Sequence, residues 1–496
     1  MNTIETPLFE RVRGLAEAFP DKPAATCSSA SITRSELVTQ AEYLARNLKS
    51  RGVIRGDLVA IVLPNDLNHI VATCAIWALG AVPQPLSPKL PERELTEILR
   101  LSRPRVVIGL DPALFPTGIE IVSIDVDSVP STSADPLPPQ VPPAWKAPTS
   151  GGSTGRPKII LAGTPGVWES IEAFADILNL PGEDGTSLIT APMSHNAPFM
   201  AATLSLLRGA HVVVMPRFDA EELLAQVERH HVTWIYAVPT MMGRVRHLPS
   251  NVRERFDVSS IQVLMHMAAP CPRELKHWFI TWLGAKKVWE LYAGTEAQAL
   301  TTIRGDSWLT HPGSVGTAVA GQIQVRDDSG SVVESGQVGR IWMRRTPGTP
   351  PTYEYIGASA TVDEQGWETL GDVGWTDVDG YLYLGDRETD MILVGGANVY
   401  PAEIESALME HPAILDACVV GRPHDEMGEV PHAFVQLRSY VEPVELRSHM
   451  QRILASYKVP RSFTISEHPF RDDAGKVRRS VLKAQLVANL NEESHV

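Results

Sequence analysis

A loop rich in glycine and hydroxyl side chains is the segment of this sequence best suited to chemistry. It reads Thr-Ser-Gly-Gly-Ser-Thr-Gly-Arg-Pro-Lys over residues 149–158. Backbone N–H groups, hydroxyls and the ammonium group of Lys158 can approach a polyphosphate closely, because glycine adds no side chain. The Gly-Lys-Ser/Thr ending of a Walker A motif is missing. The composition favours phosphate binding over a plain surface loop.

Three further clusters carry candidate groups, each with an ordinary structural alternative. In residues 292–296, Tyr-Ala-Gly-Thr-Glu, a hydroxyl beside a carboxylate suits a phosphate with its Mg²⁺, or only a helix cap. Asp372 stands in a turn, where it would accept the hydroxyls of a ribose or simply stabilise the turn. Lys476 follows Gly475 on a turn and could serve an anionic reacting centre. The alternative is a basic turn that is simply solvated.

The elements that must position these groups alternate along the first part of the chain. Helical patterns cover residues 35–51, 70–79 and 220–230, and apolar strands cover 57–63, 105–109, 211–215, 234–238 and 261–265. This alternation predicts a doubly wound α/β unit. Residues 130–148 hold seven prolines and predict an extended connector rather than a packed element. The texture is β-rich from about residue 311, and α+β in the last hundred residues, with a helix over 401–410 and a strand over 417–420.

Composition limits the class of protein. The 496 residues predict roughly three folding units, and 44% hydrophobic residues with a mean hydropathy of -0.05 exclude wholesale disorder. The formal charge of -14 argues against a chain that coats nucleic acid or an anionic membrane. Four scattered cysteines without metal-binding spacing, and no signal peptide or membrane span, predict a cytoplasmic protein.

Taken together, the identity, order and spacing of these segments resemble the acyl-adenylate-forming superfamily, over nearly the whole chain. This superfamily includes acyl-CoA synthetases, aryl-CoA ligases, luciferases and the adenylation domains of peptide synthetases. Residues 149–158 match (S/T)SG(S/T)TGxPK, and 292–296 match Y-G-x-T-E with Ala293 in place of glycine. The other matches are Leu370-Gly-Asp372 for T-G-D, Arg387, residues 400–405 for P-x-E-I-E, and Gly475-Lys476.

The resemblance implies an α/β fold with two domains. Residues 1–388 would form a large N-terminal domain of two doubly wound α/β subdomains plus a β-rich subdomain. Residues 389–496 would form a small, mobile α+β domain, with Thr389 as the hinge where the family has Asp or Lys. The implied reaction uses ATP, Mg²⁺ and CoA. A carboxylate attacks the α-phosphate of ATP, giving acyl-AMP and pyrophosphate, and the CoA thiolate then displaces AMP.

The resemblance also implies roles for individual residues. The catalytic set is Lys476, His195, Thr295 and Glu296, and Glu296 and Thr154 would hold the metal. After adenylation the small domain would rotate, carrying Lys476 away and bringing Gly395 and Gly396 towards the pantetheine. The nucleotide would be bound by Thr149, Ser150, Gly151, Gly152, Ser153, Thr154, Gly155, Lys158, Ala268, Ala269, Pro270, Tyr292, Ala293, Asp372 and Arg387.

The prediction of the acyl pocket starts from residues 192–199, which align with the family segment that gates the carboxylate. The gating residue in this sequence would be His195. No Asp occurs from residue 191 to 200, which disfavours an α-amino acid substrate. Small side chains at Ala268 and Gly294 are expected to leave cavity volume, and residues 149–158 and 191–199 look most like bile-acid, steroid and diterpenoid CoA ligases. These features predict a bulky polycyclic acid. The remaining pocket candidates are Asn196, Tyr236, Met241, Met265, His266, Leu291 and Gln298. The alternative is that about half of the candidates are ordinary core residues.

Two other functions stay open. One is a stand-alone enzyme that loads acyl-AMP onto a carrier protein, although no carrier domain follows in this sequence. The other is an inactive relative that only binds nucleotide, which the retention of Lys476, Glu296 and Asp372 disfavours. The expected partners are a small carboxylic acid, ATP and CoA, with no nucleic acid, and a homodimer stays open.

Overall fold

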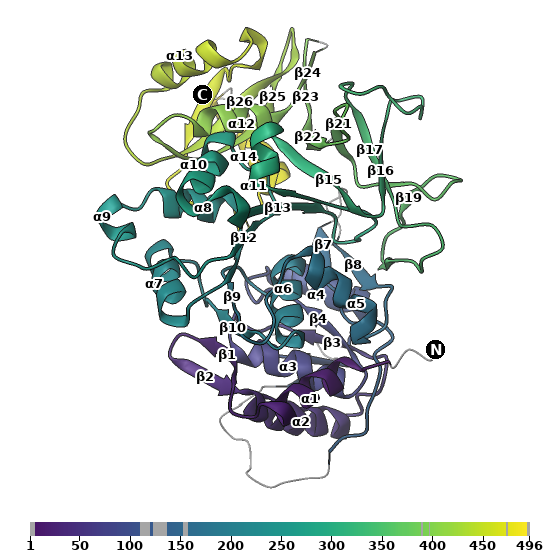
Figure 1. Ribbon diagram of the computed structural model, residues 1–496. Helices are drawn as coiled ribbons and strands as arrows, with labels where there is room; N and C mark the ends of the chain where they lie inside the picture. Colours follow the sequence, from purple (N-terminus) through teal and green to yellow (C-terminus); the bar gives the residue numbers. More distant parts are fainter. Residues whose placement is uncertain are drawn as a thin grey trace.

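The computed structural model describes residues 5–109, 120–122, 136–151, 157–387, 390–395, 397–472 and 475–493. Figure 1 shows α/β layers in the lower and middle parts, a β-rich region beside them and a small α+β unit at the top. This arrangement confirms the predicted fold class. The helices of the α/β layers are α1 (Leu8–Ala18), α2 (Arg34–Ser50), α3 (Leu67–Ala78), α4 (Glu92–Ser102), α5 (Trp168–Ile177), α6 (Asn196–Leu207), α7 (Ala220–His230), α8 (Pro239–Arg246), α9 (Ser250–Arg253) and α10 (Arg273–Leu283).

Two sheets of parallel strands form the α/β layers. The first has the order β4-β3-β5-β6, with β3 (Leu58–Ile61), β4 (Val82–Pro85), β5 (Val106–Ile108) and β6 (Glu120–Val122). In the second sheet the parallel run is β13-β12-β11-β9-β10-β1. Parallel neighbours need crossover connections, and the alternating helices supply them. The strands of this run are β1 (Pro23–Cys27), β9 (Thr186–Ile189), β10 (His211–Val214), β11 (Trp234–Ala237), β12 (Val263–His266) and β13 (Val288–Ala293).

Helices α3 and α6 are buried on nearly all sides. The whole of α3 from His69 to Ala78 is buried, and in α6 the buried residues run from Pro198 to Leu207 with the single exception of Met200. A helix that is apolar all round belongs in the interior rather than on a surface. Helix α3 contacts β3 and β4 of one sheet and β1 of the other, so it lies between the two sheets.

The large sheet continues through antiparallel strands into the β-rich region. The additional strands are β2 (Ala30–Thr33), β14 (Leu300–Arg304), β15 (Ser314–Ala320), β16 (Gln322–Arg326), β17 (Gly339–Arg344), β19 (Thr361–Val362), β20 (Glu368–Thr369), β21 (Asp372–Thr376) and β22 (Leu382–Arg387), with α11 (Gly305–Thr310) between β14 and β15. A separate sheet of three strands comprises β18 (Tyr353–Ile356), β8 (Pro157–Ala162) and β7 (Thr149–Gly151).

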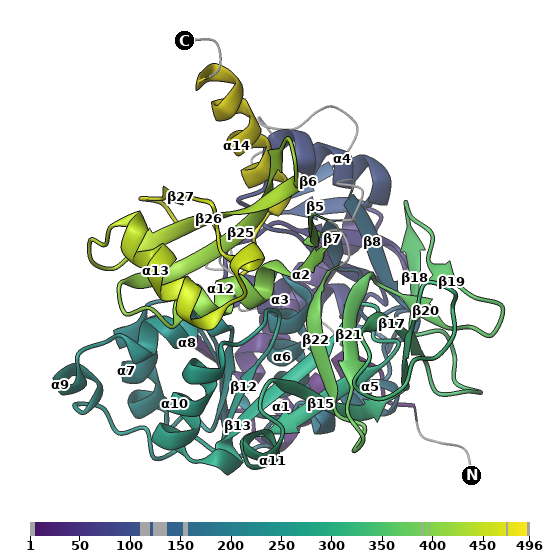
Figure 2. The ribbon, with the colours of Figure 1, turned by 90° about the horizontal axis from the view of Figure 1, so that it is seen from above.

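The C-terminal part has its own sheet and its own core. Its strands are β23 (Ile392–Val394), β24 (Ala397–Val399), β25 (Ile414–His424), β26 (Gly428–Leu437) and β27 (Ser462–Ile465), and its helices are α12 (Pro401–Met409), α13 (Pro443–Ile453) and α14 (Arg479–Glu493). The core includes Ile404, Leu408, Val419 and Val435. Figure 2 shows this unit lying over the large domain, with α14 pointing outward beside α4.

The proline-rich connector departs from its prediction. Residues 130–135 lie outside the described part, and residues 136–148 form no helix or strand, as expected. They are nevertheless packed: Trp145 is 1% exposed, and the carbonyl of Pro142 accepts from the N–H of Gly166. Prolines lack the N–H but keep the carbonyl, so the segment can still bond to its surroundings. The prediction of an unpacked connector is therefore wrong for this half.

Two smaller predictions concern cysteines and membrane spans. All four cysteines are free, three of them buried. Among the helices that the structure describes, none has the length and apolar character needed to cross a bilayer.

Candidate active site

The two ends of the glycine-rich segment lie on the paired strands of a short hairpin. Strand β7 pairs antiparallel with β8, so that Ser150 faces Lys158 across the ladder and Thr149 faces Ile159. Lys158 is thereby fixed on the returning strand. Four predicted phosphate ligands, Gly152, Ser153, Thr154 and Gly155, lie outside the described residues.

Lys158, Glu296 and Tyr355 form a compact polar cluster next to this hairpin. The Nζ of Lys158 lies 2.9 Å from Oε1 of Glu296 and 2.7 Å from the hydroxyl of Tyr355, which itself donates to the same Oε1 at 2.6 Å. Glu296 is only 4% exposed. Burial and the neighbouring carboxylate raise the pKa of Tyr355, so the phenol stays protonated and donates. A lysine at the end of the glycine-rich segment and a carboxylate 138 residues further along the chain thus meet.

A tight turn presents Thr295 and Glu296. In this turn the N–H of Ala297 donates to the carbonyl of Gly294 at 3.1 Å, and Ala297 has a φ of 54°. The turn directly follows β13, so it stands at the carboxyl end of that strand. A carboxylate beside a hydroxyl offers the hard oxygen ligands that Mg²⁺ prefers, usually together with phosphate oxygens. Glu296 therefore fits the predicted metal role, while Thr154 is not described.

The residues predicted to bind ribose lie side by side. Asp372 and Arg387 are direct partners in the antiparallel pair of β21 and β22. The hydroxyl of Tyr292, near the end of β13, donates to Oδ2 of Asp372 at 2.7 Å. The pairing of β21 with β22 therefore places Asp372 beside the backbone of Arg387, and the hydrogen bond adds Tyr292 to this group.

Ala268, Ala269 and Pro270 follow β12 on a loop that is largely exposed. Ala268 has a φ of 74°, in the left-handed region that costs a residue with a Cβ about 1–2 kcal/mol. Glycine at this position would avoid the penalty, because it has no Cβ. The neighbouring Ala293, at the end of β13, is half-buried.

The parallel strands bring all these segments to one edge. His195 follows β9, Thr240 follows β11, Ala268 follows β12 and Thr295 follows β13, each after the carboxyl end of its strand. Ligands in open α/β sheets bind at this edge. His195 is half-buried and is the N-cap residue of α6.

The turn that carries Lys476 is docked against the same edge. A Cβ built on the buried Gly475 would lie 3.2 Å from Cγ2 of Val238 and 3.4 Å from Oγ1 of Thr240, just beyond β11. The turn is closed by the N–H of Asp472 donating to the carbonyl of Lys476 at 2.8 Å. The turn before Lys476 thus lies against this edge of the sheet, and Lys476 itself is exposed.

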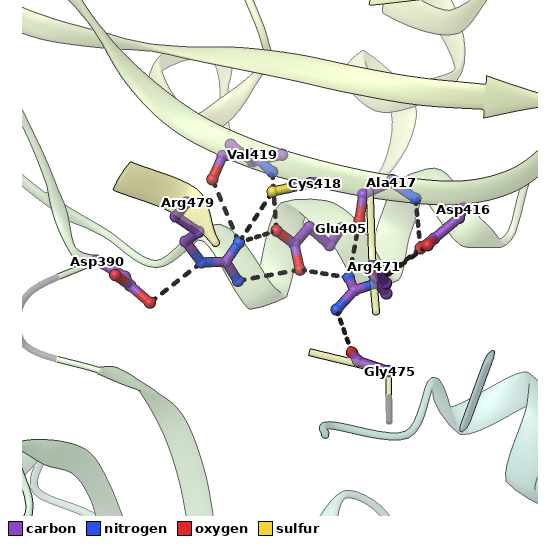
Figure 3. A network of polar contacts seen from close by, with 9 residues as sticks. All are labelled: Asp390, Glu405, Asp416, Ala417, Cys418, Val419, Arg471, Gly475 and Arg479. Carbon is purple, nitrogen blue, oxygen red and sulfur yellow. Dashed lines mark hydrogen bonds and ion pairs between the residues drawn. The ribbon is translucent and has the colours of Figure 1, made fainter. Parts of the chain in front are cut away.

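A partly buried ionic network anchors both ends of this turn (Figure 3). Arg471, before the turn, donates through Nε to both oxygens of Asp416 at 3.0 Å. Arg479, after the turn, donates through Nη1 to Glu405 at 2.5 Å and through Nε to Asp390 at 3.1 Å. Nη2 of Arg471 lies 3.5 Å from Glu405 as well. The Lys476 turn is therefore held between two arginines that share one carboxylate.

The acyl-pocket prediction needs one correction. Gly294 leaves no free volume, because a Cβ there would lie 2.3 Å from Cδ1 of Leu370. Other candidates are core residues in this structure: Tyr236 is 1% exposed, and Met265 and His266 are 0% exposed. Gln298 is 2% exposed and donates to Glu368.

The remaining candidates are placed as follows. Met241 and Leu291 are buried next to Tyr236 in the same core cluster. Asn196 is half-buried at the start of α6 and accepts from Nζ of Lys146. Gly395 has a φ of 56°, in the left-handed region that favours glycine, and a Cβ on it would lie 2.6 Å from Cε of Met427. Gly396 and Thr389 lie outside the described residues.

Sequence reasoning missed Tyr355 and Lys146. Tyr355 reaches the cluster because β18 pairs with β8, and no local pattern signals that pairing. Tyr353 and Tyr355 also line a cavity of about 290 Å³ together with Arg345 and Glu368. Lys146 stands three residues before Thr149, and this closeness to the glycine-rich segment could have drawn attention to it. Its burial was not evident from the sequence.

Comparison with known proteins gives two matches to families. Residues 12–353 match the family described as AMP-binding enzyme. Residues 403–469 match the AMP-binding enzyme C-terminal domain. The two matches follow the division between the large part of the chain and the separate C-terminal sheet.

Similar proteins of known name cover almost the whole chain. A 2-succinylbenzoate–CoA ligase of Bacillus licheniformis is 28% identical over 94% of this chain and 98% of its own. A long-chain-fatty-acid–CoA ligase of Bacillus subtilis is 27% identical over 97% of this chain and 94% of its own. The solved structure of o-succinylbenzoate CoA synthetase from Bacillus subtilis, in complex with an acyl-adenylate intermediate, superposes with a TM-score of 0.81 at 27% identity, covering 97% and 99% of the two chains.

Proposed function

Because this chain belongs to the AMP-binding enzyme family, we propose that it is an ATP-dependent acyl-CoA synthetase, an acid–thiol ligase that forms AMP. The observation that carries the proposal is the meeting of the Lys476 turn with the strand edge that bears the nucleotide residues. A site built only to bind a nucleotide has no need of a lysine brought by a second domain. The named relatives are CoA ligases, and the match covers nearly their whole length.

The first half-reaction joins two anions, so it depends on charge neutralisation and positioning. Lys476 would bridge the acid carboxylate and the α-phosphate of ATP. Lys158 and the loop before it would hold the departing pyrophosphate, and Glu296 with Thr295 would hold Mg²⁺, which neutralises phosphate charge when bound. Asp372, with its Tyr292 partner, would accept from the ribose hydroxyls. His195, at the start of α6, would gate the acid.

The second half-reaction requires the small domain to move. We place the boundary of the two domains at residues 388 and 389, with Gly395 and Gly396 meeting the pantetheine after rotation. An ion pair that joins the domains in the present orientation is Arg478 to Glu94 at 2.9 Å, and the arginine side chain is 62% exposed. Exposed ion pairs contribute at most about 1 kcal/mol, so this contact does not oppose rotation.

For the acid, we propose a hydrophobic organic acid that lacks an α-amino group. The absence of Asp from residues 191–200 supports the second part. A polycyclic acid stays a prediction: its support is the likeness of residues 149–158 and 191–199 to steroid and diterpenoid ligases, whereas the argument from Gly294 no longer holds. The similar proteins are named for 2-succinylbenzoate and for long-chain fatty acids.

The test is a panel of acids with ATP and Mg²⁺, with and without CoA. The panel holds decanoate, palmitate, benzoate, 2-succinylbenzoate, cholate and abietate, and both pyrophosphate release and acyl-CoA mass are measured. A CoA-dependent thioester from at least one acid is expected. Pyrophosphate release without any thioester would favour the alternative in which a carrier protein receives the acyl group. No pyrophosphate release with any acid would contradict the proposal.

A further inference from the structure

Lys146 is a buried lysine with no role in the reaction as described above. It is 6% exposed, and its backbone is fixed because its carbonyl accepts from the N–H of Ala162 at 3.0 Å. Its ammonium group donates to Oδ1 of Asn196, which is a neutral amide. In the part of the chain that the structure describes, no carboxylate forms an ion pair with this lysine. Burying an ammonium group without a counter-ion is costly, so such a group needs an explanation.

A second buried lysine shows how the same chain treats a purely structural ammonium group. Lys276 is 0% exposed, and its Nζ lies 2.5 Å from Oε2 of Glu290, whose side chain is 8% exposed. That pair is neutral as a unit. Lys146 instead faces the amide of Asn196 and the ring of Trp145, whose centroid lies 5.0 Å from Nζ, and neither group carries a full negative charge.

The surroundings of Lys146 favour an anion. Asn196 is the first residue of α6, and the free N–H groups at the amino end of a helix carry partial positive charge. A second positive charge there is unfavourable, whereas an anion interacts favourably with both. Burial lowers the pKa of Lys146 to about 7, although the charge of Glu296 acts in the opposite direction. The ammonium form is therefore only weakly held until an anion arrives.

The position of Lys146 connects it to the reacting ligands. It lies three residues before Thr149, where the glycine-rich loop begins, and Asn196 directly follows His195. Asn196 is half-buried, whereas Lys146 is 6% exposed, so the amide is the more accessible member of the pair. We propose that Lys146 and Asn196 form an anion-binding subsite of the reaction centre, which receives either a phosphate of the nucleotide or pyrophosphate, or the carboxylate of the acid. The inference deepens the proposed function and rests on it.

Direct binding tests the subsite without turnover. Calorimetry would compare wild type, Lys146→Met and Lys146→Arg for pyrophosphate, decanoate, benzoate and the uncharged ligand adenosine. Lys146→Met should weaken at least one anion about tenfold or more, as expected for a hydrogen bond to a charged group, and leave adenosine within about twofold. Loss of pyrophosphate affinity assigns the subsite to phosphate, and loss of decanoate or benzoate affinity assigns it to the carboxylate. Lys146→Arg should keep most of the affinity.

Stability separates a ligand-binding lysine from a structural one. Lys146→Met should leave the Tm unchanged or raise it, whereas the matched variant Lys276→Met should lower it because Glu290 stays buried without its partner. Asn196→Ala, at the half-buried position, should weaken the same anion without touching the core. The subsite would be overturned if Lys146→Met bound every anion with an affinity within about twofold of wild type. It would also be overturned if the variant lost as much affinity for adenosine as for the anions. Anion binding through Lys146 without any thioester from the acid panel would instead refute the proposed function alone.

Discussion

Arg479 and Glu405 form the closest ion pair of the network around the Lys476 turn, with Nη1 and Oε1 2.5 Å apart. Glu405 also lies 3.5 Å from Arg471 on the other side of the turn. One carboxylate of the P-x-E-I-E segment thus ties together the residues before and after the predicted catalytic lysine. The segment is a structural support of the turn rather than a group that touches substrate.

Replacing this carboxylate by an amide should therefore slow the first half-reaction selectively. Glu405→Gln is expected to lower the rate of adenylation about 10- to 100-fold, because misplacement by about 1 Å costs that much. Thioester formation from acyl-AMP supplied in advance should change little, because the proposed mechanism moves the lysine away before that step. Glu403→Gln on the same helix, whose partner is Lys458 at the surface, is the matched control and should be active. Equal losses in both half-reactions would show that Glu405 only stabilises the domain.

Removal of the Asp372 carboxylate should weaken nucleotide binding. Asp372→Ala is expected to weaken AMP binding about 10- to 100-fold and to raise the KM for ATP, because the ribose loses a charged acceptor. Tyr292→Phe removes only the phenol that donates to Asp372 and should have a much smaller effect. Calorimetry with AMP measures both. An unchanged affinity in Asp372→Ala would refute the ribose assignment.

Glycine at position 268 should relieve backbone strain. An Ala→Gly change normally destabilises a protein, because glycine loses more conformational freedom on folding. At a φ of 74° the relief of the left-handed penalty offsets that loss, so Ala268→Gly should change the free energy of unfolding by between zero and about +1 kcal/mol. Urea denaturation measures the change. A loss of more than about 1 kcal/mol would contradict the strain argument.

Stability should fall as the pH is lowered, because several histidines are buried in the neutral form. Burial lowers the pKa of His69 to about 4, and both of its ring nitrogens are buried without a hydrogen-bond partner in the structure. An unfolded histidine has a pKa near 6.5, so between about pH 6.5 and 4 the unfolded state binds the proton that the folded state excludes. The stability that this neutral histidine contributes is fully present above pH 6.5 and is lost towards pH 4.

A variant isolates the contribution of His69. His69→Leu cannot take up the proton, so the slope of the free energy of unfolding against pH should decrease by up to about 1.4 kcal/mol per pH unit in that window. Urea denaturation at pH 7, 6, 5 and 4.5 measures the two slopes. Identical slopes in wild type and variant would show that His69 is protonated in the folded state.

The sequence predicted the elements more accurately than the contacts between them. Helix α7 spans Ala220–His230 as expected, since an Asp N-cap and a clear apolar face mark it. The resemblance assigned Lys158 and Glu296, 138 residues apart, to one nucleotide site, but it did not predict the direct contact between them. Side-chain packing was not accessible in this way: Leu370 fills the space beside Gly294, and the buried Lys146 bonds to Asn196 of α6 and Ala162 of β8. A glycine in a sequence shows a missing side chain, not an empty space.

We propose that the C-terminal domain brings Lys476 to the site for adenylation only. The most direct measurement compares Lys476→Ala with wild type in each half-reaction, using the best acid of the panel and its acyl-AMP prepared in advance. Adenylation should fall by about two to four orders of magnitude, the range for loss of one electrostatic stabiliser, while transfer from acyl-AMP to CoA stays within about threefold. An equal fall in both half-reactions, or full adenylation without Lys476, would contradict the account.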